Sequence, residues 1–228
     1  LRKKYKKKIS LIKKNKIGKF NKKFKYVFLS FRPKDLNSNL NFYSSLFDQN
    51  TIFYSVLAGK HISDIKKIFP INKNILRLML NTPISVNEGT IVYNSLKKKV
   101  NNIELFLLNL LGKVYNLKKE KLFDLITAIV GSGPAFFYYL SESMEKAAVN
   151  YGLNKSLSKK VIKGTYIGTA KIISNFDTSF SSLRKSVTSE GGTTESAINF
   201  LKKNYFEKLI INSVSQAVKK AKILRSKK

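Results

Sequence analysis

The chain has 228 residues and a hydrophobic fraction of 43%, which is enough for one large domain or two small ones and excludes a disordered polymer. It contains no cysteine, so disulfides and thiolate metal sites are excluded, and this composition fits a reducing compartment. The formal net charge of +31 raises the question of a nucleic-acid partner.

Lysine supplies this charge along the whole chain. Arginine accounts for only five of the 44 basic residues, and the lysines are spread from end to end instead of being gathered on one element. Nucleic-acid readers more often use arginine, because its planar fork makes bidentate contacts. We therefore favour a general enrichment in lysine over a dedicated nucleic-acid function, although any chain with this charge is expected to bind polyanions at low salt.

The N-terminal stretch opens with a lysine run and continues into KISLI, a short apolar run of strand type. It lacks the apolar segment of a secretory signal, and its low serine content speaks against an organelle transit peptide, which stays open as an alternative. No apolar run in the sequence reaches the roughly 18 residues of a membrane span.

The first half of the chain then alternates strands with helices. Apolar, β-rich runs predict strands at 25–31, 51–59, 75–83, 90–94 and 113–117. Apolar residues at helical spacing predict helices at 35–46, 61–69 and 100–112. Alternation of this kind predicts a parallel α/β sheet, here in a domain that spans residues 1–118.

From residue 119 onward every predicted element is a helix. Two helical segments meet at the GSGP sequence of residues 131–134, where a proline close to a helix start is tolerated. Further helices are predicted at 157–174, 180–187 and 205–225, so residues 119–228 form an all-helical domain. So many apolar positions in so short a bundle predict that another subunit covers part of its surface.

The stretch VTSEGGTTESAIN (187–199) carries the clearest sign of a binding site. Two glycines lie between hydroxyl residues and the start of a predicted helix, and glycine lets the backbone approach a ligand closely. A helix that begins on such a turn directs free N–H groups and a positive dipole end outward, which suits a small carboxylate or phosphate. The local pattern alone leaves this anion site and a plain capped helix equally open.

A second candidate site lies at one edge of the predicted sheet. In open parallel sheets ligands bind outside the carboxyl ends of the strands, and these ends are followed here by Arg32-Pro33, Ala58-Gly59 and Asn81. Lys14 comes just after the first apolar run, where a basic group favours a 2′-phosphate and therefore NADPH over NADH. The general excess of lysine leaves that preference open.

Metal sites and catalytic triads find no support in the sequence. The single histidine, His61, lies on the polar side of a short predicted helix, and we expect a surface residue there and not a catalytic base. The chain has no HExxH motif and no paired histidines, so no metal site is expected.

Five segments occur in the order and spacing of one known family: FRP, SVLAG, LMLNTP, TAIVGSGPAFFYYLSESM and VTSEGGTTESAI. Over residues 9–224 the chain resembles pyrroline-5-carboxylate reductase. The resemblance implies a partial Rossmann-type, NAD(P)-binding domain followed by a helical dimerisation domain. It also implies a cytoplasmic enzyme that reduces 1-pyrroline-5-carboxylate to L-proline with NADPH or NADH, in the last step of proline synthesis. The resemblance implies a homodimer or higher homo-oligomer, with no specific nucleic acid and no membrane as a partner.

The resemblance also implies roles for individual residues. The substrate carboxylate would be bound by the turn and helix start, and the Thr194 hydroxyl would lie near the ring nitrogen as the catalytic group. The implied substrate-binding residues are Ser189, Gly191, Gly192, Thr193 and Thr194. The implied cofactor-binding residues are Lys14, Asn15, Arg32, Pro33, Ala58, Gly59 and Asn81.

The chain departs from the family pattern at four places. A Val-Lys-Pro type motif appears as Phe31-Arg32-Pro33, which keeps the cation. Glu190 stands where the family has proline, Leu80 replaces the first proline of a Met-Pro-Asn-Thr-Pro motif, and the first strand with its GxGxxG loop does not occur. The last departure allows two expectations: the sequence is a piece of a longer protein, or the pyrophosphate cradle is gone. In the second case the chain would be a non-catalytic remnant that dimerises without binding the cofactor.

Overall fold

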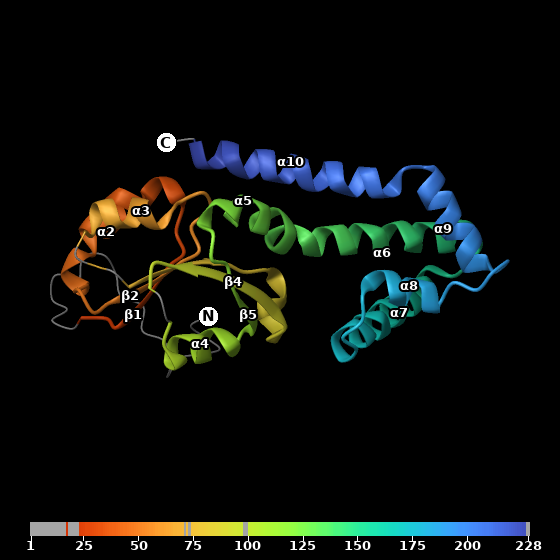
Figure 1. Ribbon diagram of the computed structural model, residues 1–228, viewed down its shortest axis with the longest axis horizontal. Helices are drawn as coiled ribbons and strands as arrows, with labels where there is room; N and C mark the ends of the chain where they lie inside the picture. The colour runs from red at the N-terminus through yellow and green to blue at the C-terminus, as the bar shows by residue number, and fades with distance from the viewer. Residues whose placement is uncertain (1–16, 18–22, 71, 73, 98–99, 227–228) are drawn as a thin grey trace. The chain divides into compact units, whose positions relative to one another are not determined.

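The computed structural model describes residues 17, 23–70, 72, 74–97 and 100–226, so the expected strand KISLI and the expected cofactor residues Lys14 and Asn15 lie outside the described residues. The chain forms two compact units. One consists of Leu1–Gly131 with Lys219–Lys228, and the other of Ser132–Val218. The first contains a sheet with helices and the second is helical, which confirms the predicted α/β plus α class (Figure 1).

The first unit is built on a five-stranded sheet with the order β1-β2-β3-β4-β5. The pairs β1–β2, β2–β3 and β4–β5 are parallel, so most of the pairing expected of a parallel, Rossmann-type sheet is present. Each strand lies within or beside one of the predicted runs. Their bounds are β1 Tyr26–Leu29, β2 Ile52–Ser55, β3 Ile75–Met79, β4 Gly89–Ser95 and β5 Gly112–Asn116.

The β3–β4 pair is antiparallel, with Leu78 opposite Tyr93, and the prediction of a parallel strand was wrong there. The physical reason is the connection, which contains only the 3₁₀ turn η4 (Thr82–Val86). A parallel connection needs a crossover of roughly a dozen residues or more. As a result, β4 and β5 end at the sheet edge opposite to the one where β1, β2 and β3 end.

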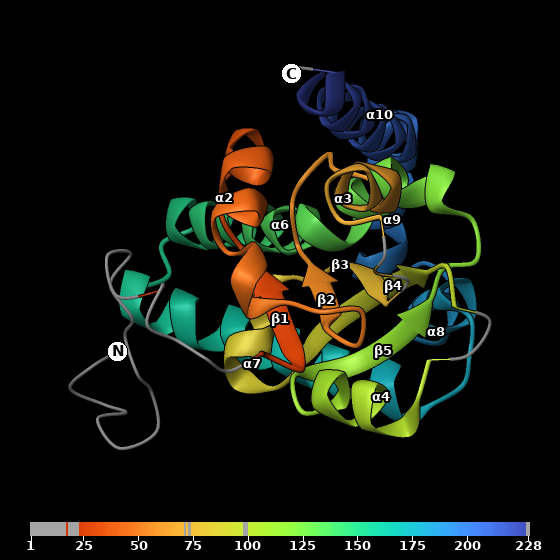
Figure 2. The same cartoon turned by 90° about the vertical axis from the view of Figure 1, so that its left-hand side faces the viewer.

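Helices cover both faces of this sheet (Figure 2). On one face α2 (Leu36–Phe42) and α3 (Ile62–Ile68) bury side chains such as Leu40 and Ile65 against Phe53. On the other face α4 (Asn102–Asn109) buries Leu108 among residues of β2, β3 and β4. Short 3₁₀ turns complete the unit: η2 Pro33–Asp35, η3 Ser44–Leu46 and η5 Glu120–Leu122.

Strand β1 is less buried than its apolar run predicted. Its Phe28 side chain is 49% exposed, and only Leu29 of the four residues is buried. The reason is its position, because β1 is the outermost strand of the described sheet and pairs with β2 alone. How deeply an apolar strand is buried depends on its place in the strand order. The residues of the strand do not show whether it lies in the middle of the sheet or at its side.

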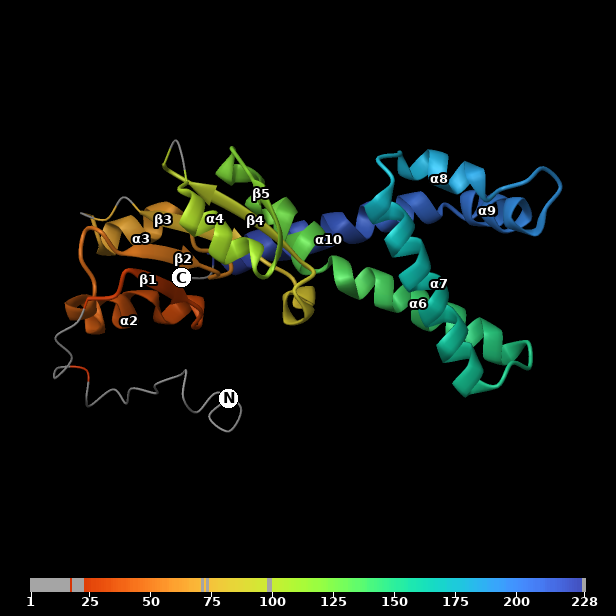
Figure 3. The ribbon, with the colours of Figure 1, turned by 90° about the horizontal axis from the view of Figure 1, so that it is seen from below.

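The helical elements match the predicted break at GSGP. Helix α5 (Phe123–Ile126) passes into a π-helical turn, η6 (Thr127–Gly131), before α6 (Gly133–Asn150) begins. Helices α6 and α7 pack against each other in the second unit (Figure 3). The remaining helices are α7 Lys155–Asn175, α8 Phe180–Ser186, α9 Thr193–Lys203 and α10 Phe206–Ser226. The π-helical turn was not predicted, and such turns are frequent at functional sites.

The second unit has no apolar core of its own. Among its residues Ser132–Val218 only Gly133 and Ser158 are buried, and neither has a large apolar side chain. Large apolar side chains are exposed on every one of its helices, for example Tyr139, Phe180 and Leu209. A bundle with so little buried apolar area cannot offset the entropy of ordering its own chain.

Among the described residues one helical run, Glu120–Asn150, is long and apolar enough to cross a membrane by length and composition alone, and its apolar window has a mean hydropathy of 1.3. This corrects the expectation that no stretch of the chain reaches that threshold. Only 28% of its apolar window is buried within the chain. A single run of this kind does not by itself indicate a membrane protein, because apolar helices of soluble proteins pass the same test.

Candidate functional site

The turn between α8 and α9 requires both of its glycines. Gly191 has a φ of 68°, in the left-handed region that favours glycine. Gly192 is the N-cap of α9, and a Cβ atom there would lie 2.5 Å from Ser189 Oγ and 3.1 Å from Ser189 O. The Gly192 N–H donates to Ser189 O at 3.1 Å, so the turn is closed by a backbone hydrogen bond.

A carboxylate of the chain itself holds this turn. Glu195 is the third residue of α9, and its Oε2 accepts a hydrogen bond from Gly191 N at 2.8 Å. The contact resembles half of a capping box, in which a carboxylate at the third helical position reaches back to a preceding N–H. Glu190, the residue that replaces proline, is exposed.

The first turn of α9 retains free donors. Within the described residues no hydrogen bond is formed by the backbone N–H of Thr193 or of Thr194, as is usual at a helix start. Their hydroxyls and that of Ser189 belong to the same short segment, and Thr194 is partly buried whereas Ser189 is exposed. Two N–H groups at the positive end of a helix, with hydroxyls beside them, can bind a small carboxylate.

The sheet brings the expected cofactor residues of the first unit to one edge. Because β1, β2 and β3 are parallel, the segments that follow them, with Arg32-Pro33, Ala58-Gly59 and Asn81, lie at the same edge. The Gly59 φ of 73° is left-handed, so this loop also depends on glycine. Asn81 Oδ1 accepts from Thr90 N at 2.8 Å, which fixes the loop after β3 to β4.

The expected cation at this edge is accessible. The Arg32 side chain is 74% exposed, and its Nε lies 2.9 Å from Asp35 Oδ2 in the following 3₁₀ turn. An exposed pair of this kind is weak, so the guanidinium can exchange its partner for a phosphate at small cost.

Sequence reasoning missed a charged cluster beneath this edge. Arg77, in the middle of β3, is only 3% exposed, and its Nη1 lies 2.9 Å from Glu120 Oε1 and 3.2 Å from His61 Nδ1. Its guanidinium carbon lies 4.1 Å from the centre of the Phe123 ring. His61 is therefore a half-buried N-cap residue and not the surface residue expected. The signal in the sequence was a lone arginine inside the apolar run ILRLML.

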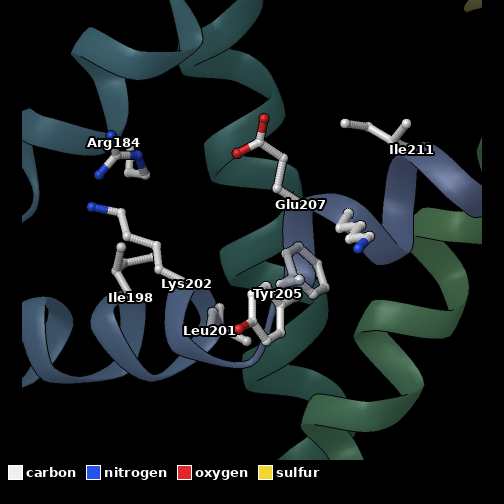
Figure 4. Close-up of a pocket in the computed structure, with 9 residues that line it drawn as sticks. Arg184, Ile198, Leu201, Lys202, Tyr205, Glu207 and Ile211 are labelled. Carbon is white, nitrogen blue, oxygen red and sulfur yellow. The ribbon is translucent and has the colours of Figure 1, made fainter.

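An apolar groove of about 570 Å³ lies in the second unit, near the junction of α9 and α10 (Figure 4). Apolar side chains such as Leu201 and Ile211 line it, together with charged ones such as Arg184 and Glu207. Tyr205 has a left-handed φ of 57° at the junction and forms part of the groove wall. No residue of the 189–194 turn lines this groove.

The described residues offer no metal site, because nowhere among them do three or more His, Asp or Glu side chains come together in a way that could hold an ion.

Comparisons with known proteins identify the family. A family model described as "Pyrroline-5-carboxylate reductase dimerisation" matches residues 120–224. The pyrroline-5-carboxylate reductase of Staphylococcus haemolyticus is 33% identical over 200 residues, which are 85% of this chain and 72% of that protein. This chain belongs to the pyrroline-5-carboxylate reductase family.

Further members of the family agree in sequence and in fold. Pyrroline-5-carboxylate reductase 1 of Bacillus subtilis is 32% identical, over 85% of this chain and 66% of that protein. The crystal structure of the Plasmodium falciparum pyrroline carboxylate reductase with NADP bound matches this chain with a TM-score of 0.76 at 29% identity. The match covers 89% of this chain and 78% of the Plasmodium falciparum chain. The structure of the Coxiella burnetii pyrroline-5-carboxylate reductase matches with a TM-score of 0.78 at 29% identity, over 88% of this chain and 76% of the Coxiella burnetii chain.

Proposed function

We propose that this protein is a pyrroline-5-carboxylate reductase, which reduces 1-pyrroline-5-carboxylate to L-proline in the last step of proline biosynthesis. Membership of the family supports the reaction. The observation that carries the proposal in this chain is the Gly191–Gly192 turn, which leaves two unpaired N–H groups and three hydroxyls at the start of α9. Such a group of donors fits a substrate whose one fixed charge is a carboxylate.

In this proposal the substrate carboxylate accepts hydrogen bonds from the N–H groups of Thr193 and Thr194. Ser189 adds a hydroxyl, and Gly191 and Gly192 allow the close approach because neither has a side chain. The Thr194 hydroxyl lies near the ring nitrogen and acts as the catalytic group. A protonated imine is already an electrophile, so the protein mainly has to hold and orient it, which is a proximity effect.

A nicotinamide cofactor, when bound, supplies the hydride. The residues at the carboxyl edge of β1–β3 fit such a group: Arg32 carries an exposed cation, Pro33 is rigid, and Gly59 has no Cβ at a left-handed turn. We assign cofactor binding to the residues Arg32, Pro33, Ala58, Gly59 and Asn81 at this edge, and to Lys14 and Asn15. The NADP bound to the Plasmodium falciparum relative supports NADPH, with NADH as the other member of the class.

The test is a direct titration followed by an assay. We expect the full chain to bind NADPH with micromolar affinity, measured by fluorescence, and to oxidise it only when 1-pyrroline-5-carboxylate is added. A protein that shows no NADPH binding up to millimolar concentration would be the dimerising remnant instead, and the proposal of a reductase would fall.

We further propose a homodimer or higher homo-oligomer. The family model named for dimerisation covers the helices that lack a core of their own. The space beside Gly164 and Gly168 of α7 is open, because a Cβ atom at either position would meet no atom within 4 Å. A second copy can therefore approach this helix closely. We assign the apolar surface of α6 to that copy and not to a bilayer, and we place the enzyme in the cytoplasm.

Light scattering checks this assignment. We expect a mass of at least twice that of one chain at micromolar concentration, because the exposed apolar area of the helical unit needs a partner. A monomeric mass at that concentration contradicts it, and a mass that reaches the oligomer only in the presence of lipid vesicles would point to the membrane.

A further inference from the structure

A buried cation in β3 forms the centre of a cluster that the proposed reaction does not use. The Arg77 side chain is 3% exposed, and an ionised group at such a position must be paired to be tolerated. Its Nη1 donates to Glu120 Oε1 at 2.9 Å, and its guanidinium stacks over the Phe123 ring. The chain segment that follows β5 is in this way tied to the middle of β3.

The same carboxylate oxygen fixes a second element. Glu120 Oε1 accepts the backbone N–H of Ile62, the first residue of α3, at 3.0 Å. The ring nitrogen Nδ1 of His61 lies 3.3 Å from this oxygen. The backbone N–H of His61 donates to Asp64 Oδ2 at 2.8 Å. A carboxylate at the amino end of a helix is favoured by the helix dipole and by the unpaired N–H groups there.

This geometry connects the cluster to the carboxyl edge of the sheet. Ile62 follows the Ala58-Gly59 loop by only three residues, so the position of the amino end of α3 determines where that loop lies. Gly59 is followed by Lys60, whose N–H bonds back to Leu57 O, which keeps the loop short and tight. Arg77 itself stands four residues before Asn81, on the strand that leads into the neighbouring loop.

We propose that Glu120 is a positioning residue for cofactor binding. Held by the buried Arg77, its carboxylate fixes the amino end of α3 and through it the Ala58-Gly59 loop at the carboxyl edge of β1–β3. The inference rests on the proposed function for the identity of the ligand at that edge. Glu120 itself does not contact the ligand.

The charge of Glu120 is essential to this role. The Glu120→Gln change keeps the size of the side chain and one acceptor oxygen, but it removes the ion pair with Arg77 and makes the hydrogen bond from the Ile62 N–H a neutral one. We expect the dissociation constant for NADPH to rise about tenfold, which corresponds to the loss of one charged hydrogen bond at the loop. At saturating NADPH, kcat and the KM for the imine should stay within about twofold, since Glu120 is not one of the residues proposed to bind the substrate.

A matched control exists in the same sheet unit. Glu104 is fully buried at the start of α4 and pairs with Lys97 at 3.0 Å, but α4 follows β4 and lies at the opposite edge of the sheet. Glu104→Gln keeps its capping role, because glutamine also serves in a capping box. We expect this variant to lose stability without any change in NADPH affinity.

The experiment measures NADPH binding by fluorescence in the wild type and both variants, together with hydrogen exchange of the 58–62 amides. A tenfold weaker binding in Glu120→Gln alone, with faster exchange at Ile62, supports the proposal. Unchanged NADPH affinity in Glu120→Gln, or an equal loss in both variants, overturns it while leaving the reductase assignment intact. A wild type without NADPH affinity overturns both.

Discussion

The Gly112→Ala variant will lose most of the folding stability of the sheet unit. A Cβ atom at Gly112 would lie 2.0 Å from Gly89 O and 2.4 Å from Gly89 N, and the Gly112 φ of 143° is one that residues with side chains rarely adopt. The obstruction is backbone, so no side-chain rearrangement relieves it. We expect the free energy of unfolding to fall by about 4 kcal/mol, from overpacking and backbone strain together.

Chemical denaturation followed by circular dichroism measures this loss. Gly131→Ala is the matched control, because a Cβ there meets only side-chain atoms, the flexible Met79 Sδ at 3.3 Å and Thr127 Cγ2 at 3.9 Å, and the backbone has an ordinary φ. Its stability should change by less than about 1 kcal/mol. A Gly112→Ala protein as stable as this control would show that β4 and β5 do not approach through the Gly89–Gly112 pair.

The Thr194→Ala variant will lower kcat/KM for imine reduction by about a hundredfold. In the proposed site the Thr194 hydroxyl lies near the ring nitrogen while its backbone N–H binds the carboxylate. Alanine removes the hydroxyl together with the γ-methyl group and keeps the N–H. The removal of one preorganised donor at a reacting centre costs about that factor in other enzymes. The N-cap of α9 is Gly192, so the helix itself should keep its stability.

Steady-state kinetics with a Ser196→Ala control separates the hydroxyl from the helix. Ser196 is exposed, belongs to the same first turn of α9, and donates its N–H to Gly192 O. Its activity should match that of the wild type. If Thr194→Ala also retains full activity, Thr194 is not the catalytic group, although the reductase assignment would still stand on the family and the cofactor titration.

Much of the fold follows from local patterns in the chain. The run TIFYS predicts β2, and the GGTT turn predicts the start of α9, because alternation, helical spacing and glycine preferences act over a few residues. The resemblance to the family added the roles of the turn residues, which the local pattern alone left open between a capped helix and an anion site.

The features that were missed depend on partners far apart in the sequence. Glu120 meets Arg77 and Ile62 across 43 and 58 positions, and no local pattern encodes such a pairing. The antiparallel pairing of β3 with β4, in contrast, could have been predicted from the sequence. The connection between the two strands is too short for the crossover that a parallel pair needs. Glu195 lies close to the turn in the sequence, but the local pattern did not predict that its carboxylate holds Gly191.

The helical unit, in which only Gly133 and Ser158 are buried, has one further consequence. A domain with its own core keeps its structure however dilute the solution becomes. Here, folding of the helices and the encounter with a second copy would be a single event, so the fraction folded would follow mass action. Dilution would then act on this half of the protein as a denaturant does, while the sheet unit, with its two buried clusters, would remain folded.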